Sequence, residues 1–409
     1  MTAWGSCRLG APRPAVDSRP IGRVFVARSN VHRCECGRAE APRGPRFVPC
    51  SEMSTDAKTP GAAQRSLHDS WQIAGITVPN RVLLAPLAGI GNWFVRLQAQ
   101  RHGAGMTVSE MVSSFAIHYG NEKTCVELLR VDERERGGGP LAIQLFGQDP
   151  EVMRSAAAYV AEHARPDIID LNMGCPVPKV MGSGAGAAML KDPDTAVAVA
   201  KAAAEGSGLP VTVKLRSGIK KGDADGYAVA QRLVEEAGVA AITFHPRSAQ
   251  VQHKGAPDLV LAAKLVEELP VPVIISGGMN EPAWITDAWQ QTGAEAIMLA
   301  RGAFGNPWLF ARVLGLRESD PSREEIVGEL LWVIEQAVAH LGEQRATGYL
   351  RKFYPWYVET LGDGHVLQNA LQRAATLDEV RATVRALVEE PAPVDEQGVV
   401  GSALRGVAA

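Results

Sequence analysis

The amino-acid sequence predicts an α/β protein: a (β/α)8 barrel, the TIM-barrel fold, followed by a small all-helical domain. Eight short runs of apolar, β-type residues recur at even spacing over about 220 residues, beginning at residue 82. Helical segments separate most of these runs, as in a barrel of alternating strands and helices. After about residue 318 only helical patterns remain. A doubly wound parallel sheet is the alternative, although it rarely needs eight evenly spaced units.

The eight predicted strands are continuous apolar runs, as expected of strands that are buried on both faces. They cover residues 82–86, 106–109, 141–145, 168–172, 211–215, 241–245, 273–276 and 296–300. Helices are predicted between them at residues 150–164, 193–205, 224–237, 257–268 and 281–291. A hairpin over residues 71–80, with Gly75 as its turn, is expected to cap the barrel floor.

The chain is expected to divide into four parts. A barrel domain covers residues 66–318, and a helical domain covers residues 319–390. Capping boxes, Ser322 with Glu325 and Thr376 with Glu379, open the first and the last helix of the second domain. The extension 1–65 and the polar tail 391–409 are predicted to be disordered, because neither carries enough periodic apolar sequence to form a core.

The extension is rich in arginine and proline, and its first 50 residues contain no lysine. It lacks the apolar segment of a secretory signal, so a transit peptide or sequence upstream of a start at Met53 are the alternatives. The second is favoured, because proline breaks an amphipathic helix, and residues 1–52 are then dispensable. A zinc site at His32, Cys34, Cys36 and Cys50 is disfavoured, since the spacing matches no common zinc pattern.

The overall composition excludes several classes of protein. Basic residues number 42 and acidic residues 45, a net charge of −3, which rules out a globally basic nucleic-acid binder but not a local basic patch. No apolar run approaches the ~18 residues of a membrane span, so no membrane partner is expected. Six cysteines are too few for a disulfide scaffold at this length, and they indicate a reducing compartment and therefore a cytoplasmic protein.

Polar residues follow the predicted strands at their carboxyl ends, where the catalytic groups of a barrel lie. Gly277-Gly278 and Ala300-Arg301 follow the last two strands, and backbone N–H groups of such turns bind phosphate. Two ordinary tight turns are the alternative. The Gln144 amide suits the edge of a flat heterocycle, and Lys214 would stabilise a reduced flavin anion. Together these features indicate flavin mononucleotide (FMN), with an ion pair as the alternative role of Lys214.

Cys175 is the candidate catalytic residue. It follows the fourth predicted strand, between Gly174 and Pro176, in a polar loop aimed at the same rim. A thiol in that place is positioned to give or take a proton. The alternative is a small buried residue, a frequent role of free cysteine.

At these residues the chain resembles the tRNA-dihydrouridine synthase family, in its bacterial B-type branch. The resemblance spans about residues 70 to 375, and the segment Asp170-Leu171-Asn172-Met173-Gly174-Cys175-Pro176 is its most specific motif. The other matching motifs are Ala85-Pro86-Leu87-Ala88-Gly89, Gln144-Leu145-Phe146-Gly147, Gly184-Ala185-Gly186, Val213-Lys214-Leu215-Arg216, His245-Pro246-Arg247, Arg301-Gly302-Ala303 and the segment 305–310. The resemblance implies an enzyme that uses NADPH to reduce FMN and then reduces the C5–C6 bond of a uridine in the tRNA D-loop. Hydride passes from flavin N5 to C6, and Cys175 donates the proton to C5.

The resemblance also implies the other site residues. Asn172 and Arg247 are expected beside the uracil and its backbone. FMN is expected to be held by Pro86, Leu87, Ala88, Gln144, Lys214, His245, Ser276, Gly277, Gly278, Ala300 and Arg301. The chain departs from the family at the Ser276–Gly278 turn, usually Asn-Gly-Asp, at Pro246, usually Gly, and at His253, where an aromatic residue is common.

Binding of tRNA requires contacts to phosphates, for which Arg351 and Lys352 of the helical domain are the main candidates. Further candidates are Lys214, Arg216, Lys220, Lys221, Lys254 and Arg345. A monomer with tRNA as its partner is expected. A flavin barrel that acts on free pyrimidines, such as a dihydroorotate dehydrogenase, and a non-catalytic tRNA-binding protein are the alternatives. The first predicts no added helical domain, and the second predicts loss of the cysteine or of the flavin-binding residues.

Overall fold

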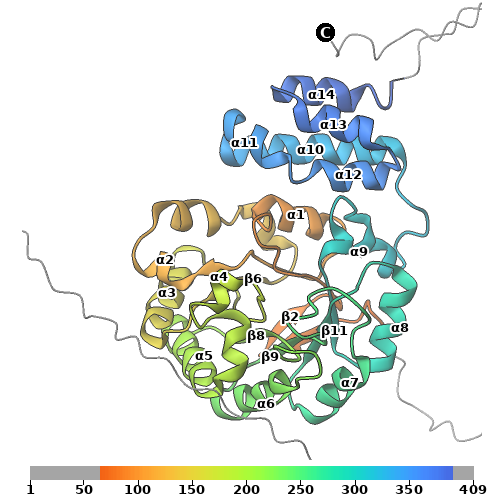
Figure 1. The fold of residues 1–409 in the computed structure, drawn as a ribbon. Coiled ribbons are helices and arrows are strands. Elements are labelled where there is room, and N and C mark those ends of the chain that lie inside the picture. Colours follow the sequence, from red (N-terminus) through yellow and green to blue (C-terminus); the bar gives the residue numbers. More distant parts are fainter. Residues whose placement is uncertain (1–64, 390–409) are drawn as a thin grey trace, which may run out of the picture. The chain divides into compact units, whose positions relative to one another are not determined.

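The computed structural model describes residues 65–389 (Figure 1). Its strands are β1 (Trp71–Ile73), β2 (Ile76–Val78), β3 (Val82–Leu84), β4 (Met106–Val108), β5 (Val112–Ser113), β6 (Leu141–Phe146), β7 (Ile168–Met173), β8 (Val211–Arg216), β9 (Ala241–His245), β10 (Val273–Ser276) and β11 (Ala296–Leu299). The predicted extension 1–65, apart from its last residue, and the predicted tail 391–409 lie outside the described residues.

Helices alternate with these strands and then continue alone after β11. The α-helices are α1 (Trp93–Arg101), α2 (Ser114–His118), α3 (Pro150–His163), α4 (Pro178–Met181), α5 (Pro193–Ser207), α6 (Asp225–Ala237), α7 (Leu259–Glu268), α8 (Pro282–Thr292), α9 (Trp308–Val313), α10 (Arg323–Leu341), α11 (Glu343–Leu350), α12 (Tyr354–Leu361), α13 (His365–Arg373) and α14 (Leu377–Arg385). The shorter turns are the π-helix η1 (Thr124–Leu128) and the 3-10 helices η2 (Glu133–Gly137), η3 (Gly186–Lys191) and η4 (Arg301–Ala303).

Eight parallel strands close into a barrel. Along the sheet the order is β4, β3, β11, β10, β9, β8, β7, β6, and a further pairing between β4 and β6 completes the ring. The short β5 adds to β6 in parallel, where Val112 pairs with Leu145. Helices surround the strands, so the predicted (β/α)8 barrel followed by helices is confirmed (Figure 1). The doubly wound sheet is wrong, because it would leave two open edges.

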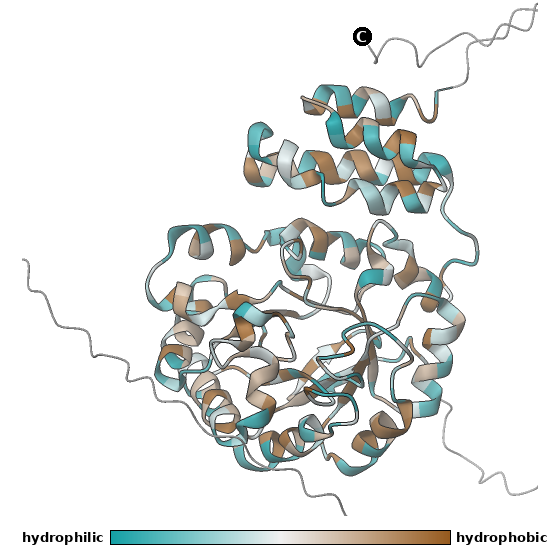
Figure 2. Ribbon diagram, viewed as in Figure 1, coloured by the Kyte–Doolittle hydropathy of each residue, from teal (hydrophilic) through white to brown (hydrophobic). Residues whose placement is uncertain are grey.

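The predicted strands and helices agree with the observed ones to within a few residues. Two local signals explain the agreement, the apolar sequence of the buried strands and the capping residues of the helices. The strands are buried on both faces, as the burial of every residue of β3, β4, β9, β10 and β11 shows. Aspartates are the N-cap residues of several helices. The side chains of Asp149, Asp192 and Asp258 accept hydrogen bonds from backbone N–H groups in the first turns of α3, α5 and α7. In Figure 2 the helices carry both hydrophobic and hydrophilic faces.

Of three local expectations, two are confirmed and one is confirmed only in part. The hairpin is present as β1 and β2, joined by a turn in which Gly75 has a φ of 84°. The Ser322–Glu325 capping box is also present. At α14, Thr376 accepts from the Glu379 N–H as predicted, but the Glu379 carboxylate accepts from the N–H of Ala375. The reciprocal half of that predicted capping box is therefore displaced by one residue.

The link between β4 and β6 has no counterpart in the sequence pattern. It contains β5, α2, η1 and η2 in place of a single helix. Each of these elements is six residues long or shorter, too short for a helical or strand period to emerge from the sequence.

Helices α10 to α14 contact the barrel in part through α1. The Gln98 amide donates to Glu329 at 2.9 Å and to the Tyr357 hydroxyl at 2.8 Å, and these groups are buried. Asn92, which caps α1, donates to the Tyr349 hydroxyl. The exact domain boundary at residues 318 and 319 stays a prediction. Across residues 65–389, no helix is long and apolar enough to cross a bilayer.

A fully buried ion pair holds the segment between β3 and α1. Arg96 donates to both carboxylate oxygens of Glu135, at 2.7 and 3.1 Å, and neither side chain has any exposure. Arg96 also donates to the carbonyl of Gly91 at 3.1 Å. Glu135 in turn accepts from the N–H of Asp132 as part of a capping box. The pair thus anchors the loop that follows β3.

Removal of one partner should be strongly destabilising. Glu135→Ala leaves the Arg96 guanidinium buried and unneutralised, and we expect a loss of about 3–5 kcal/mol in unfolding free energy. Glu135→Gln keeps most of the hydrogen bonds and should lose less. Urea denaturation measures both variants, and a loss below about 1 kcal/mol for Glu135→Ala would contradict the anchoring role.

Candidate active site

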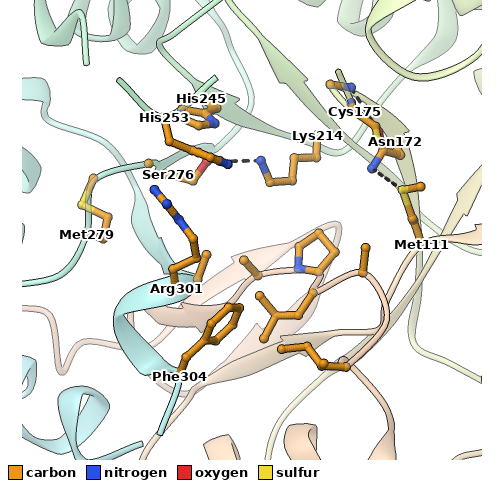
Figure 3. Close-up of a pocket in the computed structure, with 18 of the residues that line it drawn as sticks. Met111, Asn172, Cys175, Lys214, His245, His253, Ser276, Met279, Arg301 and Phe304 are labelled. Carbon is orange, nitrogen blue, oxygen red and sulfur yellow. Dashed lines mark hydrogen bonds between the residues drawn. The ribbon is translucent and has the colours of Figure 1, made fainter. Parts of the chain in front are cut away.

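A cavity of about 550 Å³ opens at the carboxyl ends of the barrel strands. Most of the residues predicted from the sequence line it, although they come from the ends of seven strands and from the segment between α11 and α12. The predicted residues in its wall are Pro86, Leu87, Ala88, Gln144, Asn172, Cys175, Lys214, His245, Ser276, Gly277, Gly278, Ala300, Arg301 and Lys352. Figure 3 shows Asn172 and Cys175 together on one side, with Arg301 and Met279 on the other.

Two predicted residues do not line the cavity. Arg247 is buried behind the wall, where its guanidinium donates to the carbonyl of Gly255 at 2.8 and 3.1 Å. Arg351 is exposed on the segment between α11 and α12, and its carbonyl accepts from the Gln372 amide. Contact of either residue with substrate stays a prediction.

The glycine turn after β10 leaves backbone exposed to a ligand. Gly277 and Gly278 have φ values of 100° and 82°, which side chains rarely adopt. A Cβ on Gly277 would overlap the His245 imidazole, and one on Gly278 would lie 3.1 Å from the Arg247 guanidinium. The turn therefore requires glycine at both positions, and phosphate binding by its backbone stays a prediction.

The cavity wall carries an excess of positive charge. Lys214 Nζ donates to the Ser276 hydroxyl at 3.3 Å rather than to a carboxylate (Figure 3). Burial lowers the pKa of Lys214 to about 8 and, together with neighbouring cations, that of Arg216 to about 10. Burial and the same cations hold the pKa of His245 far below its usual value, so this imidazole is neutral. Such a wall favours an anionic ligand.

A chain of hydrogen bonds runs beneath the cavity floor toward Cys175. The buried Asp170 accepts from the Gln144 amide and from the Thr212 hydroxyl, both at 2.6 Å. Gln144 accepts from the Asn172 amide at 2.8 Å, and Asn172 accepts from the backbone N–H of Cys175 at 2.9 Å. Sequence analysis identified Gln144, Asn172 and Cys175 as site residues, but it did not predict the hydrogen bonds between them.

Cys175 is half-buried in the cavity wall. Its loop is held from two sides, because Asn172 accepts from its N–H and Arg216 donates to the carbonyl of Gly174 at 2.9 Å. Arg216 also donates to the carbonyl of Gln252 at 2.9 Å, which ties this loop to the segment after β9. Cys175 thus lies at the cavity wall, and its role as a proton donor stays a prediction.

Several lining residues were not among the predicted site residues. Met111, Met279 and Phe304 contribute apolar surface, and Trp356 of α12 packs on Phe304 with ring centroids 4.3 Å apart. Arg216, which the sequence suggested only as a candidate for RNA binding, lines the wall as well. The apolar residues and Trp356 carry no motif or spacing that separates them from core residues, so sequence offered no signal for them.

Lys352 lies at the cavity rather than on a remote face of the helical region. Its Nζ donates to the carbonyl of Gly89 at 3.1 Å and lies 4.8 Å from the centre of the Tyr349 ring. The Glu110 carboxyl group accepts a hydrogen bond from the N–H of Gly89 at 2.8 Å. Burial raises the pKa of Glu110. Lys352 therefore supports the loop after β3 in addition to its predicted contact with RNA.

The described residues contain no group of three or more His, Cys, Asp or Glu side chains that could hold a metal ion. The zinc alternative at His32, Cys34, Cys36 and Cys50 lies outside residues 65–389.

Comparison with known proteins assigns the family. The family model described as dihydrouridine synthase (Dus) matches residues 83–392. The chain belongs to the dihydrouridine synthase family. It is 32% identical to tRNA-dihydrouridine synthase B of Pseudomonas aeruginosa, over 78% of this chain and 96% of that protein. The proteins of the same name from Xanthomonas axonopodis and Pasteurella multocida are 30% and 32% identical, over 77% and 73% of this chain and 94% and 90% of theirs.

Among solved structures, a variant of NCR from Zymomonas mobilis matches with 16% identity and a TM-score of 0.47, over 62% of this chain and 92% of that one. The fold assignment rests instead on the closed ring of strands.

Proposed function

We propose that this member of the family is an FMN-dependent tRNA-dihydrouridine synthase. It would reduce the C5–C6 double bond of a uridine in the tRNA D-loop, with NADPH as reductant, as a monomer in the cytoplasm. The observation that carries the proposal is one cavity that combines a glycine anion-binding turn, buried cations and the Cys175 thiol. The tRNA substrate comes from the names of the relatives.

The residues present fit FMN. The Gly277–Gly278 turn has no room for side chains, and Arg301 beside it supplies a counter-charge for the phosphate. Gln144 and Lys214 present an amide and a cation to a planar ring, and Pro86, Leu87 and Ala88 offer apolar surface. A cavity of about 550 Å³ lies within the usual size of cofactor sites. When bound, FMN supplies the hydride chemistry, since it takes two electrons from NADPH and passes them to uracil C6.

The residues of the chain supply the other half of the reduction. Addition of a hydride to C6 leaves a negative charge that is shared between C5 and the C4 carbonyl oxygen. Protonation at C5 neutralises this charge. Cys175 holds such a proton at the cavity wall, in a loop fixed by Asn172 and Arg216. The target base must leave its stack to reach a cavity at the carboxyl ends of the barrel strands, so base flipping is part of the proposal. Lys352, which lines the cavity, and the exposed Arg351 next to it in sequence are the proposed contacts to the RNA backbone.

The direct test in cells is mass-spectrometric mapping of dihydrouridine in tRNA from a strain that lacks this gene. We expect one or more D-loop positions to revert to uridine, and expression of the chain to restore them. A tRNA population unchanged by the deletion, in a strain without a second family member, would contradict the proposal.

Lys214 should control the affinity for FMN and its pH dependence. The lysine is a cation below its pKa of about 8, so the wild-type FMN dissociation constant should rise as the pH increases beyond 8. Lys214→Ala should weaken binding by about tenfold or more and should abolish this pH dependence. Fluorescence titration with FMN from pH 6.5 to 9.5 measures both effects. Lys201→Ala, which removes an exposed lysine of α5, is the control. Full affinity in Lys214→Ala would refute the role.

Cys175 should act in one half-reaction only. Cys175→Ala should bind FMN and be reduced by NADPH at the wild-type rate, while reoxidation by tRNA slows by roughly 10² to 10⁴, the usual contribution of a positioned acid. Cys175→Ser should recover little, because a hydroxyl is a far weaker acid than a thiol.

Stopped-flow absorbance at the flavin band follows the two half-reactions separately. Cys125→Ala removes the other free cysteine of the described region and serves as the control. If Cys175→Ala reoxidises as fast as the wild type and dihydrouridine forms, the proton comes from elsewhere.

Arg351 should contribute to RNA binding without affecting the flavin. Arg351→Ala should weaken tRNA binding and lower the slope of log K against log salt by up to about one unit, as expected for one lost phosphate contact. Reduction of the flavin by NADPH should not change, because Arg351 does not line the cavity. Arg385→Ala removes an exposed cation of α14 as a control. An unaltered salt slope in Arg351→Ala would remove this residue from the interface.

A further inference from the structure

The buried carboxyl of Asp170 has no role in the reaction described above, although it lies directly beneath the site. The residue is 3% exposed, and its carboxylate accepts hydrogen bonds from side chains of the two neighbouring strands. Asp170 is paired in register with Gln144 on β6 and with Thr212 on β8, so the three side chains lie side by side. Two residues further along β7 is Asn172, and three beyond that is Cys175.

Asp170 determines the orientation of its neighbours because a carboxylate only accepts hydrogen bonds. The Gln144 amide must turn its NH2 group toward Asp170, where the distance is 2.6 Å. Its oxygen then faces Asn172 and accepts from that amide at 2.8 Å. The Asn172 oxygen is left facing the backbone N–H of Cys175 at 2.9 Å. Reversal of either amide would place acceptor against acceptor or donor against donor.

We propose that Asp170 is a positioning residue that fixes the direction of the whole hydrogen-bond chain and, through Gln144 and Asn172, the position of the Cys175 loop. The inference rests on the proposed function, since it concerns the same proton donor. Gln144 and Asn172 both line the cavity, so the chain also decides where a ligand meets a donor and where it meets an acceptor. Lys214 on β8 is the charged neighbour that favours the ionised form of Asp170.

The direction of the chain distinguishes this role from simple packing. Thr212 also donates to Asp170, at 2.6 Å, and it does not line the cavity. A neutral amide in place of the carboxylate can still accept from Gln144, provided that its NH2 group donates to the Thr212 hydroxyl. Removal of that hydroxyl takes this option away. The two side chains should therefore be coupled if direction matters, and independent if only volume matters.

The test is a double-mutant cycle of Asp170→Asn and Thr212→Val in FMN-loaded, full-length protein. Both changes nearly conserve side-chain volume. In Thr212→Val, assayed at a pH well above the pKa of Asp170, the carboxylate still orients Gln144, so reoxidation of the reduced flavin by tRNA should stay within about twofold of wild type. In Asp170→Asn it should slow by about threefold at most. The double variant should be slower than wild type by at least about tenfold, well beyond the product of the single effects.

The expected loss in the double variant has a defined cause. The introduced amide finds no acceptor at position 212 and satisfies its NH2 group only by turning it toward Gln144. Gln144 and Asn172 then reverse in turn, and a donor faces the N–H of Cys175. Single effects that simply multiply, or an Asp170→Asn variant as slow as the double variant, would overturn the inference.

A second measurement keeps the inference separate from the proposed function. The alkylation rate of Cys175 by iodoacetamide, followed by peptide mass spectrometry with Cys125 as internal reference, reports on the loop without tRNA. It should change by about threefold or more in the double variant alone. If wild-type protein forms no dihydrouridine from tRNA, the proposed function fails, yet the alkylation rates still decide whether Asp170 sets the direction. Equal alkylation rates in all four proteins would contradict that role.

Discussion

Closure of the eight-stranded ring is the constraint on which the site depends. Because all eight strands are parallel and β4 pairs with β6, every carboxyl end meets at one mouth. Register then places side chains from neighbouring strands at the same level: Gln144 beside Asp170, and Asn172 beside Lys214. A hydrophobic interior below this level excludes water, so the polar groups at the mouth act on one another in a medium of low dielectric. The chemistry of the site is a consequence of this geometry.

The low dielectric explains why the titratable groups are perturbed in opposite directions. Burial raises the pKa of Asp170 to about 6 and lowers that of Lys214 to about 8, so each charge is costly by itself. The cost of Asp170 is offset by two hydrogen bonds, whereas within residues 65–389 the ammonium of Lys214 donates only to the Ser276 hydroxyl, at 3.3 Å. An anionic ligand would compensate Lys214 and Arg301 together. Folding of the protein without a ligand therefore already includes the unfavourable free energy of burying these charges.

Sequence patterns predicted the strands and most of the wall, because buried parallel strands and the glycine turn leave strong local signals. Gly277 is an example, since its conformation and the nearby imidazole admit no side chain. Relations between distant elements were not predictable: the chain from Asp170 to Cys175 depends on register, and Trp356 reaches the cavity only through the packing of α12. Arg247 is a residue for which the sequence pattern was misleading. Its position after a strand end suggested that it lines the cavity, but its guanidinium donates instead to the carbonyl of Gly255.

The most direct test of the central claim is a single turnover of purified, FMN-loaded protein with tRNA that lacks modifications. The protein is reduced fully, freed of NADPH and mixed with excess tRNA, and dihydrouridine is counted by mass spectrometry. The account predicts one dihydrouridine in the D-loop for each flavin reoxidised, because FMN carries one hydride and Cys175 supplies the matching proton. Flavin that reoxidises without forming dihydrouridine, or purified protein that binds no flavin, would contradict it.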